Sequence, residues 1–169
     1  AAGRTLRQSF FTASADRMTT LRPGHPDFPV DGRGVVFSGA TRRPVVCGLT
    51  RPHSARLHGG SLWVANSGYG ELRRIRYGRT ELTVRLPGWT RGLTFAGRTA
   101  VAGTSRSLPR FRAYAPGLNP RTAVCGVHAL DARTGRVEGS MIWPKGNQIF
   151  AVEWLKRSHS AGFPQAEGV

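Results

Sequence analysis

Residues 48–76 read GLTRPHSARLHGGSLWVANSGYGELRRIR, and much of this pattern returns 38 residues further on as TRGLTFAGRTAVAGTS, at residues 90–105. Aligned without a gap, Leu57 falls on Phe95, and each copy carries a glycine two positions later. A repeat of about 40 residues made of short strands and glycine turns is typical of β-propeller blades. The repeat therefore predicts an all-β chain.

Apolar runs bounded by Gly, Pro, Asn or Asp divide the remaining sequence into short strands. They predict a partial β-propeller-like array of about three four-stranded blades plus an incomplete blade. The domain spans residues 1–155, with a long loop at 104–124, and residues 156–169 have the composition of a tail. The first blade begins within the chain, so its first strand is expected upstream or in the opening residues. The expected strands are Phe10–Ser14, Gly34–Ser38, Pro44–Leu49, Ser54–His58, Ser61–Asn66, Glu71–Tyr77, Glu81–Leu86, Arg91–Phe95, Thr99–Gly103, Cys125–Asp131 and Arg136–Trp143, with Ile149–Leu155 opening a fourth blade.

Length and composition agree with this architecture. A chain of 169 residues is normally one domain, and 22 glycines with 11 prolines favour turns over long helices. No apolar run approaches the roughly 20 residues of a transmembrane helix, and the N-terminus lacks the apolar segment of a signal peptide. We therefore expect a soluble, cytoplasmic protein. No phosphate-binding glycine loop precedes a helix, and the histidines have no metal-ligand spacing, so neither a cofactor nor a metal is expected.

The net charge of +16 comes from 23 arginines and only 2 lysines. The arginines are spread along the whole chain and interrupted by Pro, Gly and apolar residues, which favours a solvated basic surface shaped by GC-rich codon usage. A field of this size also attracts phosphate polymers. Non-specific nucleic-acid binding through the arginine-rich surface thus remains an alternative function.

Two cysteines are too few for a disulfide scaffold. Cys47 and Cys125 fall on outer strands two blades apart. Because a disulfide needs Cα atoms within about 7 Å, we predict two unpaired thiols.

The candidate ligand site comes from the register of the repeat, which makes His53 and Arg91 equivalent. The first strand of each propeller blade lines the central channel, so strand starts converge at one mouth. Asn147 and Gln148, just before the expected fourth-blade strand, approach the same region. Imidazole, guanidinium and amide groups suit an anionic or polyhydroxylated ligand. The alternative is that His53 is hydrogen-bonded to backbone in a blade-entry turn.

A second candidate is the pair Asn66 and Glu71, within Asn-Ser-Gly-Tyr-Gly-Glu. Their oxygens could coordinate a hard cation. Alternatively, Asn66 shapes a turn between strands and Glu71 pairs with a neighbouring arginine, which we favour.

Catalytic machinery is not evident in the sequence. Ser54 follows His53 directly, but neighbours on a strand point to opposite faces, and no nucleophile elbow is present. The four tryptophans could stack on bases or sugars, yet their apolar, strand-like flanks favour packing within or between blades. Those tryptophans are Trp63, Trp89, Trp143 and Trp154.

Several strings in order resemble a bacterial family of unknown function with a propeller-like domain, the TIGR03032 family: GLTRPHS at 48–54, LWVANSG at 62–68, LPGWTRGL at 86–93 and CGV at 125–127. The resemblance covers Phe10 to Leu155 and implies a propeller-like fold corresponding to the C-terminal half of a family member about twice as long. Where the family carries an acidic pattern around a Phe near its end, residues 147–151 read NQIFA. A cation or acid–base role built on those carboxylates does not carry over.

The sequence thus favours a non-enzymatic ligand-binding or protein-interaction scaffold, holding a small anionic or polyhydroxylated ligand at the channel mouth. The alternative is a lactonase-like hydrolase with a cation in the central channel. An open array exposes apolar blade faces, so we expect it to bind the missing propeller half or to self-associate.

Overall fold

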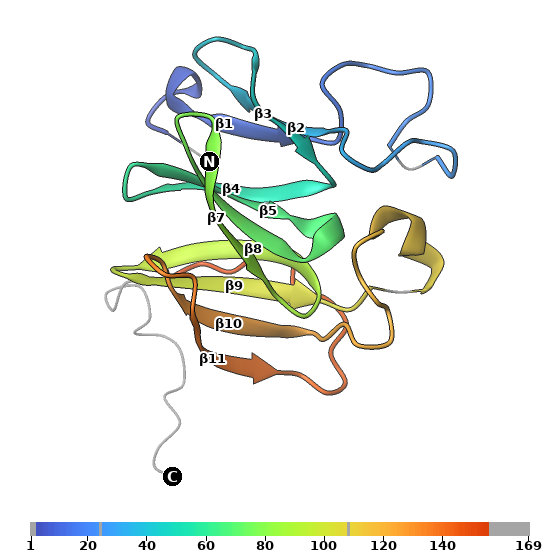
Figure 1. Ribbon diagram of the computed structural model, residues 1–169, viewed down its shortest axis with the longest axis vertical. Coiled ribbons are helices and arrows are strands. Elements are labelled where there is room, and N and C mark those ends of the chain that lie inside the picture. Colours follow the sequence, from blue (N-terminus) through green and yellow to red (C-terminus); the bar gives the residue numbers. More distant parts are fainter. Residues whose placement is uncertain (1–2, 24, 108, 156–169) are drawn as a thin grey trace.

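Strands make up most of the ordered structure. The computed structural model describes residues 3–23, 25–107 and 109–155. Strand accounts for 46% of the described residues and helix for 6%, which confirms the predicted all-β class. The described strands form three antiparallel sheets (Figure 1): β1 (Phe10–Ala13), β2 (Gly34–Ser38) and β3 (Pro44–Leu49) in sheet 1; β4 (Pro52–His58), β5 (Ser61–Asn66), β6 (Glu71–Arg76) and β7 (Arg79–Arg85) in sheet 2; β8 (Trp89–Ala96), β9 (Thr99–Ser105), β10 (Gly126–Asp131) and β11 (Val137–Ile142) in sheet 3.

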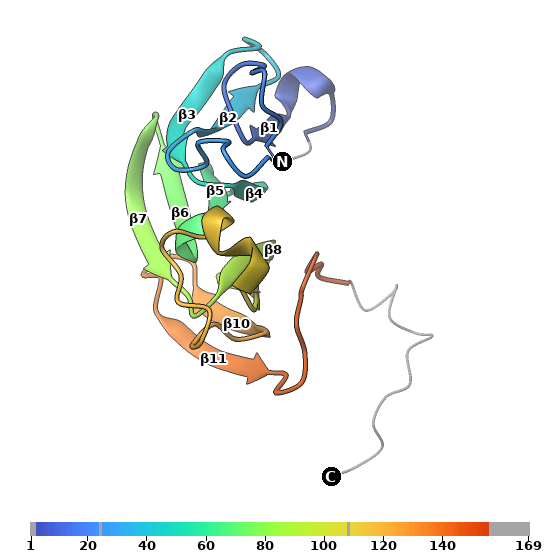
Figure 2. The ribbon, with the colours of Figure 1, turned by 90° about the vertical axis from the view of Figure 1, so that its right-hand side faces the viewer.

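The three sheets follow one another as blades of a partial propeller-like array. Within each sheet the strands pair in sequence order, and β4 contacts both β1 and β8. Figure 2 shows the sheets along an arc, with β3, β7 and β11 on its convex side. The described residues form an open arc, in which β1, β4 and β8 are the inner strands.

In sheet 1 the missing strand is not the one that the sequence predicted. The opening residues form a 3-10 turn, η1 (Leu6–Gln8), in place of a first strand. Instead β1 itself contacts β4 as β4 contacts β8, so it takes the inner position. Relative to the other two sheets, the described part of sheet 1 therefore lacks the outer strand, not the inner one.

The sequence repeat is visible in the backbone at Ser54 and Gly92, which are 38 residues apart. Both have positive φ angles, of 52° and 80°. The register of each inner strand shifts at this point. A Cβ atom at Gly92 would lie 2.7 Å from the backbone nitrogen of Val152, so only glycine fits there. The bulge turns the start of each inner strand, where the candidate site residues lie.

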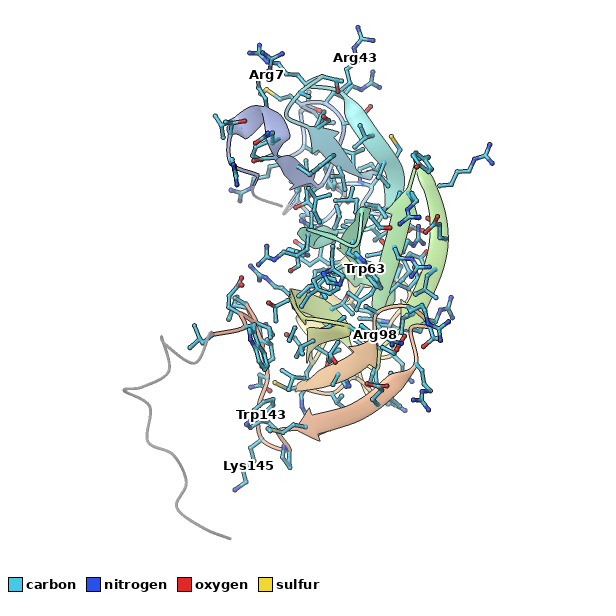
Figure 3. All side chains as sticks on the ribbon, turned by 90° about the vertical axis from the view of Figure 1, so that its left-hand side faces the viewer. Arg7, Arg43, Trp63, Arg98, Trp143 and Lys145 are labelled. Atoms are coloured by element: carbon cyan, nitrogen blue, oxygen red, sulfur yellow. The ribbon has the colours of Figure 1, made fainter. Side chains whose placement is uncertain are left out.

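Apolar side chains fill both inter-sheet spaces. All six residues of β5 are buried, as expected of a strand covered on both faces. Trp63 is 2% exposed and packs edge-on against Phe95, with ring centroids 5.5 Å apart. Figure 3 shows Trp63 within the body of the molecule, whereas Arg7 and Arg43 project outward from the end that carries sheet 1. The cluster between sheets 2 and 3 comprises Trp63, Ala65, Leu72, Val84, Leu86, Leu93, Ala100, Ala102, Leu130 and Ala132, and that between sheets 1 and 2 comprises Val36, Leu49, Ala55, Leu62, Val64 and Ile75.

The prediction of a fourth-blade strand at 149–155 was wrong, although the segment lies where such a strand would lie. These residues have no strand assignment. They run beside β8, held by side-chain hydroxyls: Ser105 Oγ accepts from the Ile149 backbone nitrogen at 2.8 Å, and Thr94 Oγ1 accepts from that of Trp154 at 3.2 Å. Without a second strand among the described residues, the segment has no ladder to join.

Other expectations had mixed outcomes. The 104–124 loop carries a 3-10 turn, η3 (Pro109–Tyr114), and the tail at 156–169 lies outside the described residues. Both Cys47 and Cys125 are free, as predicted.

Trp143 and Trp154 are 40% and 60% exposed, so the packing prediction was wrong for them, since no described sheet covers that side of sheet 3. No helix of the described residues is long and apolar enough to cross a membrane.

Candidate functional site

A cavity of about 320 Å³ opens where β4 and β8 begin. We call it the His53 cavity. Its walls come from the turn before β4, from the starts of β4 and β8, from the end of β9, from η3 and from the segment after β11. Its lining includes the side chains of Arg51, His53, Trp89, Arg91, Arg106, Ser107, Tyr114, Gln148 and Ile149.

Three of the four residues expected to hold a ligand line this cavity: His53, Arg91 and Gln148. Asn147 does not. Its backbone carbonyl instead accepts a hydrogen bond of 2.9 Å from the Arg106 nitrogen, which anchors the segment carrying Gln148.

His53 is fixed by its Nδ1 atom. This nitrogen lies 2.9 Å from the Arg51 carbonyl oxygen and 2.9 Å from Ser67 Oγ. The ring also tilts against Trp89, with centroids 5.7 Å apart. Burial, together with the positive charges of Arg91 and Arg51, lowers the pKa of His53 to about 4, so the imidazole is neutral at pH 7. The expected backbone hydrogen bond and the expected place at the cavity are therefore both found.

The register of the repeat also locates two cavity residues that the sequence analysis missed. Arg51 and Trp89 are 38 residues apart, like His53 and Arg91, and all four line the cavity. Trp89 had been assigned to packing, but it is partly exposed here. Tyr114 comes from the long loop, and the Arg51 guanidinium lies 4.4 Å above its ring. No repeat could have predicted that contact.

The charges of the cavity are one-sided. Arg51, Arg91 and Arg106 line it, and no described Asp or Glu does. None of the three forms a salt bridge with a described carboxylate; Arg91 lies 4.7 Å from the Phe150 ring centroid, and Arg106 donates to the carbonyls of Gly146 and Pro144. Seven arginines elsewhere in the described residues are paired with carboxylates. Salt bridges join Arg73 and Arg85 to Glu71, Arg74 and Arg76 to Glu81, Arg98 to Asp131, Arg136 to Glu138 and Arg56 to Glu153.

Two buried polar atoms at the cavity have no hydrogen-bond partner among the described residues. They are Ser107 Oγ and Arg51 Nε. Ser107 is only 6% exposed. Burial also lowers the pKa of Arg51, although its positive charge persists at neutral pH. Unpartnered buried groups are unusual in folded proteins, and a ligand would reach these two only if the lining side chains moved, because neither atom is accessible in the structure.

Asn66 and Glu71 adopt the structural alternative. Asn66 is fully buried; its Oδ1 accepts from the Thr50 nitrogen at 2.6 Å, and its Nδ2 donates to Glu71 Oε2 at 2.9 Å. Burial raises the pKa of Glu71, but hydrogen bonds from Asn66 and Arg73 outweigh it and leave the pKa lowered. The pair ties sheet 2 to the turn before β4 and offers no free oxygen cluster. No group of three or more His, Cys, Asp or Glu side chains in the described part of the chain could hold a metal.

Ser54 does not act as a nucleophile beside His53. Its Oγ accepts a hydrogen bond of 2.8 Å from the Gly92 nitrogen, which links the bulges of β4 and β8. The imidazole contacts Ser67 instead. The side chains of His53 and Ser54 thus form hydrogen bonds with different neighbours, as expected for adjacent strand residues.

A second cavity, of about 310 Å³, lies at the opposite ends of β4 and β8. We call it the Trp63 cavity. Four arginines line it, and so does Glu81; the arginines are Arg74, Arg76, Arg98 and Arg133. Arg74 Nε lies 3.4 Å from Glu81 Oε2, and Arg98 Nη2 lies 3.3 Å from Asp131 Oδ2. Three of the four arginines of this cavity are therefore paired with carboxylates of the protein itself, and Arg133 forms no salt bridge among the described residues.

Comparison with known proteins supports the fold and assigns no activity. The sequence profile described as "Domain of unknown function (DUF4915)" matches residues 9–163. Among curated protein sequences, none is similar enough to count as a match. The fold is similar to that of the computationally designed Ika4 protein, with a TM-score of 0.51 and 12% identity, over 75% of this chain and 71% of that one. BBS1N, crystallised in complex with ARL6DN, gives a TM-score of 0.44 and 18% identity over 80% of this chain; the chain covers 38% of it.

Proposed function

This chain belongs to the DUF4915 family, whose function is unknown, and from the geometry of its His53 cavity we propose that it is a non-enzymatic binding module for a small organic anion. The observation that carries the proposal is the set of three guanidinium groups that line the cavity with no carboxylate among the described residues. The motifs shared with the TIGR03032 family support a propeller-like scaffold and add no activity.

An anion would complement the cavity electrostatically. Arg51, Arg91 and Arg106 bring positive charge together in a partly enclosed space, where water screens it less than at the surface. Guanidinium groups bind carboxylates or phosphates through paired N–H donors. Trp89 and Ile149 provide apolar surface beside these donors, which favours an organic anion over a bare inorganic one.

The same charges argue against the hydrolase alternative. A divalent cation in this cavity would face three guanidiniums and no carboxylate ligand. His53 is a weak base, since its pKa is about 4, and its Nδ1 faces a carbonyl oxygen and a hydroxyl instead of a carboxylate. We therefore favour binding without chemistry.

The proposal is tested with cyclohexanecarboxylate and its neutral analogue, cyclohexanecarboxamide, by isothermal titration calorimetry. We expect the carboxylate to bind and the amide to bind at least tenfold more weakly, because hydrogen bonds to charged groups contribute about 1.5–3 kcal/mol. Arg91→Gln should weaken carboxylate binding by a similar factor.

The matched control is Arg98→Gln, which removes the same charge from the Trp63 cavity. Arg98 is already paired with Asp131, and its side chain is 78% exposed, so carboxylate affinity should stay within twofold of the wild type. Equal binding of the acid and the amide, or equal losses in the two variants, would show that the His53 cavity does not select an anion.

A further inference from the structure

The hydrogen bonds of His53 fix which of its two ring nitrogens holds the proton of the neutral imidazole. The Arg51 carbonyl oxygen, 2.9 Å from Nδ1, can only accept. Ser67 Oγ also lies 2.9 Å from Nδ1, and its single hydrogen is donated to the Thr90 carbonyl oxygen at 2.6 Å. Both neighbours of Nδ1 therefore act as acceptors, so Nδ1 carries the hydrogen of the neutral ring.

The Nε2 atom of this tautomer has a free lone pair. Among the described residues, it takes part in none of the hydrogen bonds of His53, which all involve Nδ1. The imidazole thus brings a hydrogen-bond acceptor to a cavity whose Arg51, Arg91 and Arg106 side chains are donors only. A ligand that filled the cavity with anionic oxygens alone would place a lone pair against Nε2.

We propose that the ligand of the His53 cavity is a hydroxylated organic anion, such as a hydroxy acid or sugar acid, whose carboxylate faces the arginines and whose hydroxyl donates to His53 Nε2. This inference rests on the proposed function and narrows the ligand class.

A neutral donor fits the surroundings better than a charged one. An ammonium group near Nε2 would share the cavity with three guanidiniums and no compensating carboxylate. A hydroxyl group adds no charge to the cavity. Trp89 offers an aromatic surface on which a sugar ring can pack.

Three probes of similar ring size separate the contributions: glucuronate carries a carboxylate and hydroxyls, cyclohexanecarboxylate only the charge, and methyl glucoside only hydroxyls. We expect calorimetry on the full chain to show glucuronate binding about fivefold tighter than cyclohexanecarboxylate, as one added neutral hydrogen bond allows. Methyl glucoside should bind far more weakly than either acid.

The decisive variant is His53→Asn. The Asn amide nitrogen can replace Nδ1 as the donor to Arg51 and Ser67, while the acceptor at Nε2 is removed. We expect the preference for glucuronate to vanish and the affinity for cyclohexanecarboxylate to stay within twofold. In His53→Gln, whose amide oxygen can take the place of Nε2, part of the preference should return.

Other outcomes would overturn the inference in distinguishable ways. Equal affinity of the wild type for the two acids contradicts the hydroxyl contact but leaves anion binding intact. Failure of both acids to bind, or methyl glucoside binding as tightly as glucuronate, contradicts the inference together with the proposed function. The comparison of probes on the wild type decides even if His53→Asn does not fold.

Discussion

The His53 and Trp63 cavities lie at opposite ends of the same two inner strands and are of similar volume. Each is lined by a tryptophan and by several arginines, three in the His53 cavity and four in the Trp63 cavity. They differ in what the arginines face. In the Trp63 cavity, Glu81 pairs with Arg74 and Arg76, Asp131 pairs with Arg98, and Arg133 has no described carboxylate partner. In the His53 cavity no described carboxylate does so. Identical residue types thus form salt bridges at one end of the strands, and at the other end they form the binding surface that we propose.

The largest expected contrast concerns the two tryptophans. Trp63→Ala removes a 2% exposed side chain from the core and should lower the free energy of unfolding by about 4 kcal/mol. Trp89 is partly exposed, so Trp89→Ala should lower it by only about 1–2 kcal/mol while weakening ligand binding. Urea denaturation followed by circular dichroism measures both. Equal destabilisation would mean that Trp89 is a packing residue like Trp63.

Acid should destabilise the protein through the His53 cavity. The pKa of His53 is lowered from 6.5 to about 4 in the folded state, so between these values the unfolded chain binds a proton that the folded chain does not. The stability contributed by neutral His53 is complete above pH 6.5 and falls as pH drops towards 4, by up to about 3 kcal/mol. Burial lowers the pKa of His128 too, which adds in the same direction.

Denaturation at pH 7 and pH 4.5 checks this expectation, with His53→Asn as the comparison. The variant should lose less stability between the two pH values than the wild type. The same pH dependence in both proteins would assign the effect to other groups.

The smallest contrast is between arginines. Arg74 donates to the carbonyls of Ala132 and Arg133, at 3.0 and 3.1 Å, and pairs with Glu81. Arg74→Gln should therefore destabilise the protein by about 1–2 kcal/mol. Arg91 has no described carboxylate partner, so Arg91→Gln should change stability by less than about 0.5 kcal/mol, or raise it by relieving repulsion. Thermal denaturation at low salt measures the stability of the two variants. A larger loss of stability in Arg91→Gln than in Arg74→Gln would remove the distinction between the cavities.

Much of the fold was predictable because short apolar runs and glycine turns, which are local sequence patterns, define its strands. The repeat placed the strands of sheets 2 and 3 within a few residues, and its register put His53 and Arg91 at one site. The same register contained Arg51 and Trp89, which the prediction overlooked. Tyr114 and Arg106 lie outside the repeat, so their approach depends on how the long loop and the segment after β11 fold back.

Charge pairing was the least predictable property. The composition gives a net charge of +16, yet it does not say which arginines meet a carboxylate. Glu71 pairs with Arg73, two residues along the same strand, as the sequence suggested, but it also reaches Arg85 because β6 lies beside β7, a pairing that only the sheet register defines. The fourth-blade strand failed for a related reason, since a strand needs a partner that no local pattern supplies.

The hydroxyl-mediated docking of residues 149–155 has a consequence for the dynamics of the cavity. Gln148 and Ile149 form one of its walls, and Ser105 holds Ile149 by side-chain bonds of 2.8 and 3.2 Å to its nitrogen and carbonyl oxygen. Such a wall can detach without breaking a sheet, so it should open locally at a lower free energy than β4 or β8. Its amide protons are then expected to exchange with solvent sooner than those of the opposite wall, and a ligand could enter from that side.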